Sequence, residues 1–197
     1  MPEADSVRAF VAVEIPDAVK DEIIRLVSHF SHKGYPVRWV SRNNLHLTLV
    51  FLGNNPPEFI AGVKERLTGV AAAACRFDVS LKGLGVFPNE RSPRVVWLGI
   101  EQGRNELTAL AHDTLKGLVT IGFIPEKRPF SAHLTIGRVK EPIPDARPII
   151  ARPFASPAFS VSELVLFRSF LKPTGPVYEV LDRYPFTGGV RPPTSDH

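Results

Sequence analysis

The sequence predicts an α+β protein in which two lobes, each a β-sheet covered by helices, face each other across a central groove. Helical and strand periodicities are interleaved along the chain, and several neighbouring strands are close enough in sequence to form hairpins. A His-Leu-Thr strand occurs once in each half, at His46 and at His133. The main alternative, a doubly wound parallel sheet, requires a regular strand–helix alternation, which ends after residue 122.

The composition is that of a globular domain of 197 residues, of which 44% are hydrophobic and 22% charged. These fractions exclude a disordered chain, a coiled coil and a collagen-like repeat. The single cysteine, Cys75, excludes an internal disulfide framework and a cysteine-built zinc site. Residues 1–6 lack the basic segment of a secretory signal, and no apolar run approaches the roughly 20 residues that a membrane span needs. We therefore expect a cytoplasmic protein without membrane contact.

Each expected strand or helix is a segment in which apolar residues recur at a single spacing. Each segment ends at glycine, proline or polar turn residues. The clearest is the first helix, which Pro16 and Asp17 open and Gly34 closes. Its apolar stripe recurs at helical spacing and consists of Val19, Ile23, Leu26, Val27 and Phe30. The elements of the first half are a strand at 8–15, this helix, strands at 37–40 and 45–52, a turn at 53–57 and a second helix that ends near Ala74.

The second half contains one long helix and a proline-rich segment. Its elements are strands at 76–84 and 94–100, a helix at 105–121, a strand at 132–139, a loop at 141–157 with room for a short helix, and a hairpin of strands 161–171 and 177–184. We expect one domain over residues 1–190, with an internal pseudo-duplication that places one His-Leu-Thr strand in each lobe. Residues 191–197 are expected to form a disordered tail.

The two His-Leu-Thr strands carry the candidate catalytic residues. Because residues i and i+2 of a strand point to the same face, His46 lies beside Thr48, and His133 lies beside Thr135. The opposite faces are apolar and belong to the core: Leu45, Leu47, Leu49 and Phe51 in the first strand, and Ala132, Leu134 and Ile136 in the second. One such histidine would be explained as a satisfied half-buried side chain, but two in matching contexts favour a functional site.

Two imidazoles and two hydroxyls suit acid–base chemistry on a phosphate. With an unperturbed pKa of about 6.5, one imidazole accepts a proton from water while the other, protonated, donates one to the leaving oxygen. The threonine hydroxyls donate hydrogen bonds to the non-bridging phosphate oxygens. A metal site is disfavoured because no Asp, Glu or Cys lies at ligand spacing from these histidines. We therefore expect neither a metal nor a cofactor.

The charge distribution fits a phosphate-bearing ligand. The net charge is +4, arginine outnumbers lysine 16 to 8, and the whole basic excess lies in residues 127–197. The planar guanidinium group binds phosphate through paired donors, so the arginine bias favours such a ligand. A solvated, slightly basic surface is the simpler explanation of the same numbers.

At these residues the sequence resembles the two-histidine phosphoesterase superfamily, and more closely the RNA 2′,3′-cyclic phosphodiesterases, also called 2′-5′ RNA ligases. The resemblance rests on the paired His-x-Thr motifs and on flanking strings in the same order: RAFVAVEIP, RWVSRNNLHLTLVFLG, RVVWLGI, RPFSAHLTIGR, ELVLFRSFL and GPVYEVL. It implies a bilobal two-histidine phosphoesterase-like fold, in which two antiparallel sheets with outer helices face each other across a central groove.

The resemblance also implies metal-independent hydrolysis of a terminal 2′,3′-cyclic phosphate on RNA to a 2′-phosphomonoester. In that family the histidine of the first motif is the proton donor and that of the second the proton acceptor. These roles carry over to His46 and His133, and Thr48 and Thr135 would hold the phosphate. The implied partners are RNA ends or small cyclic nucleotides that carry a 2′,3′-cyclic phosphate, and we expect a monomer.

Three further residues are candidates for substrate binding. Arg138 matches the basic residue that follows the second motif in the family. Strict alternation places it on the core side, unless a bulge at Gly137 re-aims it. Arg8 and Phe10 share the less apolar face of the first strand, where Phe10 either stacks on a base or packs against its neighbours.

Three other functions remain open at the level of sequence. The reverse reaction at the same site would ligate RNA ends through a 2′-5′ bond. A related phosphodiesterase would act on a small cyclic nucleotide or an oligoadenylate. A non-catalytic module that binds RNA ends is favoured by the basic last third of the chain. Against it, the sequence contains no RRM or KH signature, and binding alone does not require two acid–base pairs.

Overall fold

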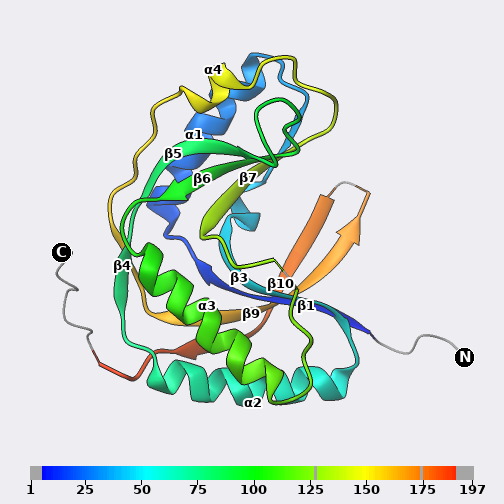
Figure 1. Ribbon diagram of the computed structural model, residues 1–197, viewed down its shortest axis with the longest axis vertical. Coiled ribbons are helices and arrows are strands. Elements are labelled where there is room, and N and C mark those ends of the chain that lie inside the picture. Colours follow the sequence, from blue (N-terminus) through cyan, green and yellow to red (C-terminus); the bar gives the residue numbers. More distant parts are fainter. Residues whose placement is uncertain (1–5, 127, 174, 190–197) are drawn as a thin grey trace, which may run out of the picture.

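Two four-stranded antiparallel sheets form the centre of the molecule, as a computed structural model shows (Figure 1). The structure describes residues 6–126, 128–173 and 175–189, so the expected tail at 191–197 lies outside it. Sheet I has the strand order β10-β9-β1-β3, sheet II has the order β2-β7-β6-β5, and β4 and β8 form a separate ladder. This arrangement confirms the predicted α+β class and is not a doubly wound parallel sheet.

The expected elements occur in the expected order. In the structure they are β1 (Val7–Glu14), α1 (Asp17–His32), β2 (Val37–Trp39), the 3₁₀-helix η1 (Arg42–Asn44), β3 (His46–Asn55), α2 (Pro57–Ala73), β4 (Phe77–Val79), β5 (Leu81–Phe87), β6 (Val95–Ile100), α3 (Arg104–Val119), β7 (His133–Val139), α4 (Arg147–Ile150), β8 (Phe159–Val161), β9 (Glu163–Lys172) and β10 (Gly175–Pro185). The predicted hairpin is β9–β10, which pairs antiparallel as expected.

Two boundaries differ from the prediction because strand partners change within an apolar run. The single strand predicted at 76–84 is two strands separated at Ser80, since β4 pairs with β8 whereas β5 pairs with β6. The turn predicted at 53–57 begins later, because β3 continues to Asn55. Gly53 stays within that strand at a φ of 74°, a backbone conformation that a residue with a side chain rarely adopts.

Helices cover only the outer faces of the two sheets (Figure 1). α1 and the short α4 lie against sheet II, and α2 and α3 lie against sheet I. The predicted apolar stripe of α1 is buried throughout, and its Phe30 stacks on Trp39 of sheet II with ring centroids 5.6 Å apart. None of the described helices is long and apolar enough to cross a membrane. The inner faces of the sheets are thus left for the site.

A short connection ties the two sheets together beside the first histidine. The chain leaves sheet II after β2, passes through η1 and enters sheet I as β3. The backbone N–H of Val40 donates to the carbonyl of Ile136 in β7 at 2.9 Å. The side-chain amide of Asn44 donates to the carbonyl of Pro176 in β10 at 2.7 Å. Cα atoms of β3 and β7 also lie within 8 Å of each other, so the two His-Leu-Thr strands are neighbours across the groove.

Candidate active site

His46 lies at the start of β3, opposite Glu14 of β1. Its Nδ1 is 2.7 Å from the carbonyl oxygen of Asn44. A carbonyl only accepts hydrogen bonds, so Nδ1 carries the proton and donates it, and Nε2 is the nitrogen free for chemistry in the neutral ring.

Aromatic rings surround the His46 imidazole on sheet I. Phe10 stacks on it with centroids 4.7 Å apart, Tyr178 meets it edge-on at 5.2 Å, and Phe167 lies 5.9 Å away. Burial among these rings lowers the pKa of His46 to about 4, although the bond to the Asn44 carbonyl favours the charged form. His46 is therefore neutral at pH 7.

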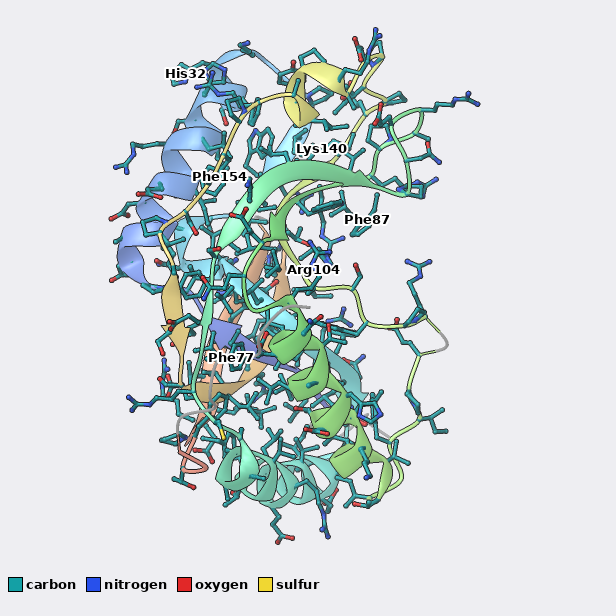
Figure 2. All side chains as sticks on the ribbon, turned by 60° about the vertical axis from the view of Figure 1, so that its left-hand side comes forward. His32, Phe77, Phe87, Arg104, Lys140 and Phe154 are labelled. Atoms are coloured by element: carbon teal, nitrogen blue, oxygen red, sulfur yellow. The ribbon has the colours of Figure 1, made fainter. Side chains whose placement is uncertain are left out.

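His133 opens β7 on the opposite sheet and is held in the same way. Its Nδ1 is 2.7 Å from the carbonyl oxygen of Ser131, which again leaves Nε2 free. Phe87 meets the imidazole edge-on at 5.0 Å, and Trp97 lies 6.4 Å away. Figure 2 shows Phe87 on the side of sheet II that faces away from α1. Gly85 makes room for this cluster, because a Cβ there would overlap the Trp97 indole.

A β-bulge in β7 settles the orientation of Arg138. Val96 pairs with Gly137 and Trp97 pairs with Thr135, so Ile136 is an extra residue in β7. Beyond such a bulge the alternation of faces shifts by one residue. Arg138 therefore lies on the same face as Thr135 and is exposed. Strict alternation, which placed Arg138 on the core side, is wrong here, and the bulge considered in the sequence analysis is present.

A second bulge corrects the prediction for Phe51. In the β1–β3 ladder Val11 pairs with Val50 and Ala12 pairs with Thr48, so Leu49 is the extra residue. Phe51 was assigned to the core face, but it is 40% exposed. It lies opposite Phe10, on the face that carries His46 and Thr48.

Arg8 and Phe10 share the groove face of β1, as expected, but their environments differ. The Arg8 guanidinium lies 4.7 Å above the Phe51 ring, in a cation–π contact. Phe10 is only 3% exposed, with His46 stacked on one side and Phe167 stacked at 5.1 Å. Phe10 therefore packs against its neighbours and does not offer a face to a base, which selects the second of its two expected roles.

Tyr178 marks the place where the two walls of the groove meet. It touches His46 on sheet I, and burial raises the pKa of its phenol. The positive charges of Arg138 and Arg8 oppose that shift, so cations from both sheets lie near the phenol. An anion held between His46 and His133 would meet positive charge from both sides.

Comparison with known proteins agrees with this geometry. A model of the LigT-like phosphoesterase family matches the chain twice, over residues 13–97 and 98–178, and each match contains one His-Leu-Thr strand. The chain belongs to the LigT-like phosphoesterase family.

Two relatives of this LigT-like phosphoesterase match it over nearly their whole length. A protein of Archaeoglobus fulgidus named RNA 2′,3′-cyclic phosphodiesterase is 40% identical over 88% of this chain and 97% of its own. One of the same name from Thermotoga maritima is 34% identical over 93% and 97%. A solved structure from Thermus thermophilus superposes with a TM-score of 0.81 at 31% identity, covering 92% of this chain and 98% of that one. LigT of E. coli complexed with 3′-AMP gives a TM-score of 0.72 at 28% identity, covering 93% and 99%.

Sequence analysis of this LigT-like phosphoesterase missed the aromatic side chains around the second histidine. Gly85, Phe87 and Trp97 all lie on the groove face of sheet II. The feature that would have indicated this cluster is a large aromatic residue, Trp97, paired with a glycine, Gly85, in the neighbouring strand. This pairing can be recognised only when the strand partners are known. Phe51 was missed because two consecutive apolar residues concealed the bulge.

Two pockets of this LigT-like phosphoesterase lie away from the two histidines. A pocket of about 410 Å³ lies between α2 and α3, and one of about 420 Å³ lies between the start of α1 and β8; neither is lined by His46 or His133. Within the described ranges, no three His, Cys, Asp or Glu side chains are grouped closely enough to bind a metal together.

Proposed function

We propose that this chain is a hydrolase that opens the terminal 2′,3′-cyclic phosphate of RNA and leaves a 2′-phosphomonoester. The observation that carries the proposal is the matched pair of imidazoles, each fixed through Nδ1 by a backbone carbonyl and each followed by a threonine on the same face. The names of relatives that are up to 40% identical support the same substrate class.

In the proposed reaction the cyclic phosphate binds between the two histidines. The free Nε2 of His133 accepts a proton from water as its oxygen bonds to phosphorus, and protonated His46 donates a proton to O3′ as the phosphorus–O3′ bond breaks. The phosphorus–O2′ bond survives, so the products are a 2′-phosphate and a 3′-hydroxyl. Thr48 and Thr135 donate to the non-bridging oxygens, and Arg138 offsets their charge. No step requires a metal.

Binding of the anionic substrate favours protonation of His46 from the solvent. The pKa of His46 is about 4, because burial among aromatic rings disfavours the charged ring. A bound phosphate anion favours the imidazolium, so the pKa rises and the complex takes up a proton. The donor role of His46 follows the resemblance to the family, and the proposed rise of its pKa on phosphate binding is compatible with that role.

Hydrolysis of 2′,3′-cyclic AMP in EDTA, followed by phosphorus NMR of the product, tests the proposed function. We expect 2′-AMP alone. His46→Asn and His133→Asn should each lower kcat by at least about 10²-fold, since a positioned acid or base is typically worth about 10²–10⁴. His112→Asn is the matched control, because His112 is exposed on α3 and should leave the rate unchanged.

The same experiment separates the alternatives. Formation of 3′-AMP, or full activity in both site variants, would overturn the proposed reaction. Binding of a cyclic-phosphate RNA without product would favour a non-catalytic module, and joining of that RNA to a 5′-hydroxyl strand would indicate ligation. We also propose that the protein acts in the cytoplasm as a monomer, which light scattering checks; the single, half-buried Cys75 is compatible with a reducing compartment.

A further inference from the structure

Two arginines face each other directly across the β2–β7 ladder. Arg38 of the edge strand β2 pairs with Arg138 of β7, and both side chains are exposed. Directly opposed residues of an antiparallel pair lie close together, so two like charges in these positions repel each other. The ion pairs of residues 6–126, 128–173 and 175–189 include neither guanidinium.

Arg42, four residues further along the chain than Arg38, differs from this pair because it has carboxylate partners. Asp21 accepts from Arg42 at 2.6 Å, and Asp17 lies 3.1 Å away. The fold thus neutralises one arginine of this segment with two carboxylates and leaves Arg38 and Arg138 as an unneutralised pair. An anionic ligand would relieve the repulsion between them.

Both guanidinium groups lie on the side of sheet II that faces the groove. Their neighbour Trp39 occupies the other face, where it packs on Phe30 of α1. Arg138 shares its face with Thr135, and its charge acts on the Tyr178 phenol of the opposite wall. Arg38 belongs to the edge strand, so it lies one strand further from β6 than Arg138 does. The positive charge therefore extends beyond the place of the reacting phosphate toward the rim of the groove.

We propose that Arg38 binds the phosphodiester that precedes the cyclic phosphate in the RNA chain. The preferred substrate class is then an oligoribonucleotide rather than a mononucleotide. This inference rests on the proposed function and adds a preference of the enzyme for the length of its RNA substrate. The reacting phosphate is the last anion of an RNA strand, so a second cationic position outside the catalytic pair meets the next phosphate of the same strand.

The test compares three substrates that end in a 2′,3′-cyclic phosphate. They are adenosine 2′,3′-cyclic phosphate, the dinucleotide ApA with a terminal cyclic phosphate, and the same dinucleotide with an uncharged methylphosphonate linkage. The measured quantity is the ratio of kcat/KM for each dinucleotide to that for the mononucleotide. In the wild type we expect the ratio to be well above one for the charged dinucleotide and near one for the methylphosphonate.

Arg38→Gln should lower the ratio for the charged dinucleotide about tenfold, the lower end of what a hydrogen bond to a charged group contributes. Arg25→Gln is the matched control, because it removes the same charge from an exposed position on α1 and should leave the ratio at the wild-type value. Equal losses on all three substrates, or an unchanged ratio, would overturn the assignment of Arg38. Turnover of the mononucleotide by the wild type tests the proposed function separately, so the two failures are distinguishable.

Discussion

At the scale of single residues, each of the two histidines is hydrogen-bonded through Nδ1 to a backbone carbonyl, but the side chains around the two rings differ. His46 is stacked beneath Phe10, whereas the nearest ring to His133, that of Phe87, meets it only by an edge. Stacking covers one face of a ring, whereas an edge contact covers a smaller part of its surface. This difference is compatible with the different protonation roles proposed for the two histidines.

The depressed pKa of His46 predicts a pH-dependent stability. The folded-state pKa of about 4 lies below the unfolded value of about 6.5. The contribution of the neutral, buried His46 to the free energy of unfolding is therefore fully present above pH 6.5 and is lost as the pH falls toward 4. Between pH 7 and pH 5 the wild type should lose about 2 kcal/mol of unfolding free energy through this group.

Urea unfolding at the two pH values measures that loss. His46→Asn has no imidazole at this position and should show a loss smaller by the same amount, while every other side chain is common to both proteins. Equal losses in the two proteins would contradict the burial of a neutral His46.

At the scale of elements, two bulges decide which side chains enter the groove. Leu49 in β3 and Ile136 in β7 are the extra residues, and each shifts the following residues to the other face. Phe51 and Arg138 reach the groove through these shifts. Bulges are frequent beside active sites because they re-aim side chains without a change of strand.

The close fit of Gly85 against Trp97 gives a prediction for sheet II. A Cβ at Gly85 would overlap the indole, so Gly85→Ala must displace Trp97 from its contact with Phe87 beside His133. We expect a loss of about 1–3 kcal/mol in stability, as for overpacked cores, together with a lower kcat.

Gly69→Ala is the control for this substitution. Gly69 lies exposed in α2 with no atom near the position of an added Cβ, and alanine there should stabilise the helix by up to about 1 kcal/mol. Thermal unfolding of the two variants should therefore move in opposite directions. A Gly85→Ala protein as stable and active as the wild type would contradict the packing described for Trp97.

The sequence allowed the elements to be predicted better than the faces of the strands. The stripe of α1, from Val19 to Phe30, is buried as predicted, because helical spacing depends only on neighbouring turns. Alternation failed at Phe51, since Leu49 and Val50 are both apolar and either could be the extra residue. The Arg38–Arg138 pair and the packing of Gly85 against Trp97 depend on which strands are neighbours. Hydrophobic periodicity does not contain that information.

At the scale of the whole molecule, the lobes share one core. A single cluster of buried side chains includes Leu98 and Ile136 of sheet II together with Leu67 and Leu107 of the helices on sheet I. The chain also crosses between the sheets through η1; Val40 just before it is hydrogen-bonded to sheet II, and Asn44 within it is hydrogen-bonded to sheet I. These features support the expectation of one domain.

Cooperative unfolding is the corresponding prediction. Both tryptophans, Trp39 and Trp97, belong to sheet II, whereas the long helices α2 and α3 cover sheet I. Tryptophan fluorescence and far-ultraviolet circular dichroism should therefore report the same urea midpoint if the lobes unfold together. Two separated midpoints would show that each lobe unfolds independently.

The anchors of the two imidazoles have a consequence for how the groove receives its substrate. A carboxylate in place of the Asn44 or Ser131 carbonyl would orient each ring equally well, but it would add a formal negative charge that repels a phosphodiester. A peptide oxygen gives direction without that charge. Since each oxygen comes from the residue two positions before its histidine, both rings are oriented by the backbone that leads into their strands before any nucleotide arrives.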